Sequence, residues 1–389
     1  MEQTAAVRGL DCTGCGRRFD ATEPGRCPDC GAPLDPAYDL EAVDADALVA
    51  ATGGSMWRFE AALPFARDSA VSVAEGGTPT VSDPGLAADL GVGEVLLKDE
   101  SRNPTGSVVD RGMALAVTAA ADRGLEPLAL AAAGNAGQSA AAYAGRVGLR
   151  SYAFVPSRAP FTNKAMVNVH GGDMRVAGGR YPAAVEARSD LQTDWHSLQE
   201  FTSPYRHEGA KTVAYELAAD RGWTAPDAVV VPCGTGELVV GIAKGFRELA
   251  ALDLVDERPP VYAAQASGCA PIAAARGSGR DAVEPWATPD TIAGELEIPD
   301  PAGGDLALAA LGRTGGGAVA VDDPDLLAAA ADATERTGVE VSPAGGAAIA
   351  AVEEIRDDLP ADATVAVVNP AGGGKTADVL RSHLMSQGE

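Results

Sequence analysis

The chain is short of positive charge and of histidine, and each shortage excludes a class of function. Lys and Arg total 30 against 55 Asp and Glu, which gives a formal net charge of −25. Nucleic acids and anionic membrane surfaces bind basic footprints, so we expect neither as a partner. Only four histidines are present and they are scattered, so a histidine-based metal site is not expected.

Long hydrophobic runs are also missing. No apolar run reaches membrane-spanning length, and the first residues lack the basic flank and apolar stretch of a signal peptide. We therefore expect a cytoplasmic protein. High salt screens the self-repulsion of so acidic a chain, so the composition predicts adaptation to a salt-rich cytoplasm, as in a halophilic archaeon. An ordinary acidic protein is the alternative.

What the chain does contain is enough apolar sequence for two α/β domains and a small module: 389 residues, 46% of them hydrophobic. Short apolar runs alternate with helical patterns, which predicts parallel sheets covered by helices. Helices are expected from about Asp110 and from about Gln138. The predicted strands lie at 95–97, 128–131, 151–155, 228–231, 260–264 and 364–368.

Four of the six cysteines form two C-x-x-C pairs near the start of the chain. They are Cys12, Cys15, Cys27 and Cys30. Two residues between thiolates let a tight turn point both sulfurs at one ion, so the pattern predicts a structural zinc ribbon. Two disulfides, or a ribbon without metal, are the alternatives. Cys233 and Cys269 are expected to be buried small hydrophobes.

Two glycine-containing segments each follow a predicted strand and open a predicted helix. They are residues 133–138 (AGNAGQ) and residues 232–238 (PCGTGEL). Backbone N–H groups at such a turn can cradle an anion at the positive end of a helix. A third glycine segment, residues 369–376 (NPAGGGKT), lies near the end of the chain.

Residues 103–112 (NPTGSVVDRG) resemble the NPTGSFKDRG segment of threonine synthases, which belong to the fold type II enzymes that use pyridoxal 5′-phosphate (PLP). Residues 56–59 (MWRF) and 75–79 (EGGTP) resemble further segments of that family. The resemblance implies the two-domain α/β architecture shared with the tryptophan synthase beta chain. The expected parts are a zinc ribbon at 1–38, a large domain at 39–100 and 190–389, and a small domain at 101–189.

The same resemblance implies roles for the glycine segments. Asn135 would contact the ring hydroxyl of PLP, and Gly234, Thr235 and Gly236 would surround its phosphate. The implied substrate-binding residues are Ser107, Gly134, Ala136, Gly137 and Gln138.

Three positions depart from the family pattern. Val109 replaces the lysine whose amine forms the Schiff base and then moves protons, and valine can do neither. Pro370 replaces the threonine that hydrogen-bonds the pyridine nitrogen, and it has no hydroxyl. Glu237 places a carboxylate where the phosphate would lie.

These departures predict a catalytically degenerate relative of threonine synthase, in which PLP is bound non-covalently or is absent. Its ligand would be a small amino acid or a phosphate compound, and its partner a second copy of the chain or an active threonine synthase. The alternative is an active PLP-dependent lyase, acting on O-phosphohomoserine or a related amino acid, with displaced catalytic residues. Lys98, the nearest lysine in sequence, would then supply the amine.

Overall fold

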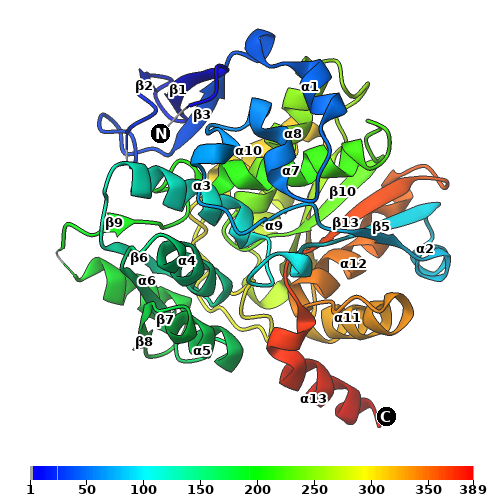
Figure 1. Cartoon of the computed structure of the whole chain (residues 1–389). Coiled ribbons are helices and arrows are strands. Elements are labelled where there is room, and N and C mark those ends of the chain that lie inside the picture. The colour runs from blue at the N-terminus through cyan, green and yellow to red at the C-terminus, as the bar shows by residue number, and fades with distance from the viewer. Residues whose placement is uncertain (1–2, 24, 192, 389) are drawn as a thin grey trace.

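A computed structural model describes residues 3–23, 25–191 and 193–388 of the chain, and three sheets organise it (Figure 1). The strand orders are β2-β1-β3, β12-β11-β10-β13-β5-β4 and β8-β7-β6-β9. The strands are β1 (Val7–Cys12), β2 (Arg18–Phe19), β3 (Leu34–Tyr38), β4 (Thr80–Ser82), β5 (Glu94–Asp99), β6 (Leu128–Ala131), β7 (Ser151–Pro156), β8 (Asp173–Ala177), β9 (His196–Ser197), β10 (Ala228–Pro232), β11 (Val261–Ala266), β12 (Ala318–Val321) and β13 (Thr364–Asn369).

Helices cover both larger sheets. They are α1 (Ala45–Ala50), α2 (Pro84–Leu90), α3 (Val109–Asp122), α4 (Asn135–Arg146), α5 (Phe161–Val169), α6 (Tyr181–Ser189), α7 (Arg206–Ala219), α8 (Glu237–Ala251), α9 (Pro271–Gly277), α10 (Gly304–Thr314), α11 (Asp323–Thr337), α12 (Pro343–Ile355) and α13 (Ala377–Gln387). The short 3₁₀ turns are η1 (Leu40–Ala42), η2 (Met56–Ala62), η3 (Arg67–Ser69), η4 (Glu100–Arg102), η5 (Ser267–Cys269), η6 (Arg356–Asp358) and η7 (Gly373–Thr376).

The six-stranded sheet forms the centre of the larger unit. Its strands run parallel except for β4, which pairs antiparallel with β5 at one edge. Strands β10 and β11 are buried along their whole length, as expected for a parallel sheet with helices on both faces. Helix α12 packs against β10, β11 and β13, while α7 and α8 pack against each other over the opposite face.

The four-stranded sheet is entirely parallel and carries α4, α5 and α6. In Figure 1 this green unit lies at the lower left, beside the larger sheet, and the blue three-stranded ribbon lies above it. Within the described residues, no helix is long and apolar enough to cross a membrane.

The predicted strands are confirmed as β5, β6, β7, β10, β11 and β13, and the predicted helices as α3, α4 and α8. Strands β4, β8, β9 and β12 were not predicted. Strand β9 pairs with β6 although it lies beyond residue 189, where the predicted small domain ends. The domain boundaries remain a prediction.

Candidate functional site

The loops that follow β6, β10 and β13 converge between the two larger sheets. Ligands of open α/β sheets bind at the carboxyl ends of the parallel strands, and these loops lie at such ends. They enclose a cavity of about 150 Å³, which we call the Val109 cavity. Its wall includes Val108, Val109, Ala131, Ala132, Ala133, Gly134, Asn135, Ala136, Tyr181, Glu200, Arg206, Pro232, Gly234, Thr235, Gly236, Glu237, Glu295 and Pro370.

Val109 begins α3 and is half-buried, with its side chain between the apolar cores of the two sheets. No lysine is among the described residues that line its cavity. Lys98 does not compensate, which corrects the expectation that it supplies an amine. Lys98 is fully buried, and its Nζ donates to the Thr78 carbonyl (2.7 Å) and pairs with Glu216 (2.8 Å).

Asn135 lies in the wall of the cavity, at the first residue of α4. Its Oδ1 accepts hydrogen bonds from Lys375 Nζ (2.8 Å) and from Asn163 Nδ2 (3.0 Å). Its Nδ2 donates to Glu295 Oε2 at 3.0 Å. Both acceptor positions of the amide are therefore used by the protein, and one N–H remains for a ligand.

The second glycine segment turns sharply into α8. Gly236 has φ +96°, and a Cβ there would lie 2.8 Å from the Gly303 carbonyl oxygen. The glycine is therefore required by the protein's own packing, whatever the loop binds. Gly234 and Thr235 line the cavity beside it.

Glu237 occupies the first turn of α8, and its carboxylate faces Arg206. The Arg206 guanidinium donates to Glu237 Oε2 at 2.7 Å, while Oε1 is buried with no hydrogen-bond partner in the described chain. Burial raises the pKa of Glu237, and the charge of Arg206 opposes that shift. The loop expected to hold a phosphate therefore already holds a carboxylate paired with an arginine.

The remaining predicted positions divide into two groups. Pro370, Gly134 and Ala136 line the Val109 cavity. Gly137 and Gln138 do not: Gly137 packs against β7, and the Gln138 amide donates to the Thr105 carbonyl (3.3 Å) and accepts from Asn163 (2.9 Å).

Ser107 lies beside the cavity rather than in its wall. It pairs with Ala371 in an antiparallel bridge and is fully buried, and its Oγ has no hydrogen-bond partner in the described chain. The substrate and cofactor roles of these residues remain predictions.

Four polar residues of the cavity were not predicted. Arg206 donates to Glu200 (3.3 Å) as well as to Glu237, and Tyr181 donates to the other oxygen of Glu200. Glu295 comes from the irregular segment between α9 and α10, and burial raises its pKa. These residues belong to no glycine motif, so only the fold brings them to the site.

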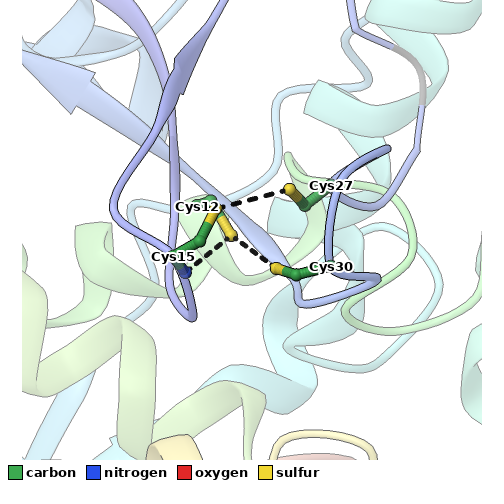
Figure 2. A group of neighbouring side chains, drawn as sticks. All are labelled: Cys12, Cys15, Cys27 and Cys30. Atoms are coloured by element: carbon green, nitrogen blue, oxygen red, sulfur yellow. Dashed lines mark hydrogen bonds between the residues drawn. The ribbon is translucent and has the colours of Figure 1, made fainter.

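The four cysteines of the ribbon lie together, with their sulfurs turned toward one another (Figure 2). The Cys12 and Cys30 sulfurs are 3.4 Å apart, and those of Cys15 and Cys27 are 3.8 Å apart. The N–H groups of Gly14 and Cys15 both approach the Cys12 sulfur. The cluster is compatible with one tetrahedral zinc ion, and none of its four cysteines is among the residues that line the Val109 cavity.

The Val109 cavity does not fit PLP bound as the family pattern would place it. Val109 offers no amine to the aldehyde, and Pro370 offers no hydroxyl to the pyridine nitrogen. At the phosphate end, Glu237 would repel a phosphate dianion. Of the expected contacts, the free N–H of Asn135 and the backbone of the turn at Gly234, Thr235 and Gly236 remain in the wall of the cavity. These residues therefore do not supply the groups that a chemical step on PLP would need.

Comparisons with known proteins agree on the family. The sequence profile of the family described as "Pyridoxal-phosphate dependent enzyme" matches residues 71–371. A threonine synthase of Methanosarcina acetivorans is 33% identical over 352 residues, covering 90% of this chain and 87% of that protein. A threonine synthase of Methanocaldococcus jannaschii is 31% identical over 375 residues, covering 94% and 93%.

Solved structures show the same fold. A fungal L-serine ammonia-lyase from Rhizomucor miehei superposes with a TM-score of 0.70 at 24% identity, covering 81% of this chain and 99% of that one. Maize serine racemase superposes with a TM-score of 0.65 at 21% identity, covering 80% and 94%. This chain therefore belongs to the pyridoxal-phosphate dependent enzyme family and is a threonine synthase-like member with the fold type II architecture.

Proposed function

We propose that this chain is a catalytically degenerate threonine synthase-like protein that binds a small carboxylate ligand, of the amino-acid class, without covalent PLP. One observation carries the proposal: the wall of the Val109 cavity contains no lysine in the described chain. Schiff-base chemistry needs an amine at the cofactor aldehyde, and that wall has none.

The proposed ligand follows from the groups that remain. The first N–H groups of α4, at Asn135 and Ala136, have no partner within the helix and favour an anionic group such as a carboxylate. Glu237 and Glu295 provide carboxylates for an ammonium group. A small zwitterion matches both kinds of group, whereas a phosphate dianion at the α8 turn is repelled by the Glu237 carboxylate.

The test is a visible spectrum of the full-length protein in high salt, titrated with PLP and then treated with borohydride. The wild-type chain should show only free aldehyde and no reduced PLP adduct. Val109→Lys is the matched variant, because it restores an amine in the same wall. An imine band in the wild-type protein, with PLP mapped to any lysine, contradicts the proposal.

The alternative is an active PLP-dependent lyase with a displaced amine, and one observation favours it. Lys375 Nζ lies 2.8 Å from Asn135 Oδ1, the residue expected beside the PLP ring. That function requires a PLP imine on Lys375 together with release of phosphate from O-phosphohomoserine.

Association with an active threonine synthase, or with a second copy of the chain, is tested by co-purification at high salt.

A further inference from the structure

Lys375 differs from every other lysine of the chain. There are five lysines in all, at positions 98, 164, 211, 244 and 375. Lys98, Lys211 and Lys244 are buried in ion pairs with carboxylates. Lys164 lies on the surface and donates to the Ser157 carbonyl (2.8 Å). Only Lys375 lines a cavity among those described.

The cavity that Lys375 lines has a volume of about 270 Å³, and we call it the Lys375 cavity. It shares part of its wall with the Val109 cavity: Ala133, Gly134, Asn135, Tyr181 and Glu295 border both. Lys375 itself is half-buried in the short turn η7, so a ligand in this cavity can reach its amine.

The protein leaves room for this side chain. Gly106 has φ +76°, and a Cβ there would lie 3.1 Å from Lys375 Cε and 3.5 Å from Nζ. The Lys375 side chain therefore lies against Gly106, in the loop that leads into α3 at Val109. In the described chain its single hydrogen bond goes to Asn135 Oδ1, and two N–H groups remain free.

The surroundings favour the neutral, nucleophilic form of this amine. Burial lowers the pKa of Lys375 to about 8, although the nearby carboxylates of Asp110 and Glu295 oppose the shift. At pH 7.5 about a quarter of such an amine is neutral, compared with about 0.1% of an ordinary lysine. Burial also raises the pKa of Asp110 to about 6, and it raises that of Glu295.

We propose that Lys375 captures a small 2-oxo carboxylate as a reversible imine. The inference rests on the proposed function, since it requires a cleft that is not occupied by covalent PLP. In a 2-oxo acid the carboxylate is bonded directly to the carbonyl carbon. The carboxylate can bind the free N–H groups at the start of α4, while the carbonyl lies beside the Lys375 amine, because Asn135 adjoins both.

The chemistry balances without an oxidant or a reductant. The neutral Nζ attacks the carbonyl carbon, a C–N bond forms, and the carbonyl electron pair moves to oxygen, which takes a proton. The resulting carbinolamine loses that oxygen as water and becomes a C=N bond. One water leaves for each imine formed, and hydrolysis returns the free lysine.

The test uses the full-length protein in high salt with 2-oxobutanoate and borohydride, followed by intact mass and peptide mapping. Reduction should leave one adduct per chain, on Lys375. At pH 7.5 labelling of Lys375 should be at least about ten-fold faster than labelling of Lys164, because more of its amine is neutral. Lys375→Gln should lose the adduct, and Lys164→Gln, a matched control on the surface, should keep it.

Equal labelling of Lys375 and Lys164, or no adduct on Lys375 in a folded protein, overturns this inference. Circular dichroism of each variant establishes the folded state. The proposed function and the assignment of Lys375 are overturned by different results. A PLP imine in the wild-type spectrum overturns the proposed function, whereas absence of both the PLP imine and the 2-oxobutanoate adduct overturns only the assignment of Lys375.

Discussion

Substituting Glu237 by glutamine tests directly whether a carboxylate excludes phosphate from the α8 turn. Glutamine keeps the size of the side chain and can still accept a hydrogen bond from Arg206, but it removes the negative charge. We expect Glu237→Gln to bind PLP, non-covalently, more tightly than the wild-type chain. The substitution leaves Val109 in place, so no imine is expected at position 109 in either protein.

The expected change in PLP affinity follows from the charges at this turn. Two unit charges 4 Å apart repel by about 4 kcal/mol at an effective dielectric constant of about 20. Arg206, 2.7 Å from the carboxylate, cancels part of that repulsion. A remainder of about 1.4–2.7 kcal/mol corresponds to a decrease of the dissociation constant for PLP by roughly 10- to 100-fold.

Calorimetric or fluorescence titration with PLP measures the change, and pyridoxal, which lacks the phosphate, is the matched control ligand. Pyridoxal affinity should be the same for both proteins. The difference in PLP affinity should also narrow as the pH falls, because the raised pKa of Glu237 lets its carboxyl become neutral at a higher pH than an ordinary glutamate does. Equal PLP affinity of both proteins at neutral pH, or an equal gain for pyridoxal, refutes the electrostatic argument.

Three further outcomes are expected. Arg111→Leu should lower the free energy of unfolding by about 3–5 kcal/mol in urea titrations, because it strands the buried carboxylates of Glu100 and Glu216; a loss below 1 kcal/mol would contradict this. Cys30→Ser should reduce the zinc content and lower the melting temperature by several degrees, whereas unchanged melting would argue against a structural metal. Raising KCl from about 0.1 M to about 2 M should raise the melting temperature of this acidic chain, and a salt-independent melt would count against adaptation to salt.

The sequence was sufficient to predict the central strands because their signal is local. Strands β6 and β10 are continuous apolar runs that the fold buries completely, so composition alone marks them. Strand β8 was missed because it lies at a sheet edge and carries exposed polar residues. Strands β4 and β9 have only three and two residues, too few for a periodicity to show.

The site was predictable only in part, because some of its residues carry a local sequence signal and others are brought together only by the fold. Both glycine turns can be recognised from the sequence, and the structure brings both of them to one cavity. The pairing of Glu237 with Arg206 was not visible, since Arg206 begins the preceding helix and reaches Glu237 only when α7 packs on α8. The position of Lys375 beside Asn135 likewise depends on two segments 240 residues apart.

The ribbon is tied to the body of the protein by charge as well as by packing. Asp35, on β3, accepts hydrogen bonds from Lys244 on α8 (2.7 Å) and is paired with His207 on α7 (2.9 Å). Tyr38, at the end of the same strand, donates to the buried Glu208 at 2.6 Å. A descendant of this chain that lost its first 38 residues would keep Lys244 and Glu208 while losing their N-terminal partners. Deletion of the ribbon could therefore persist in evolution only together with compensating substitutions on α7 and α8, so the ribbon and these two helices should be inherited as a unit.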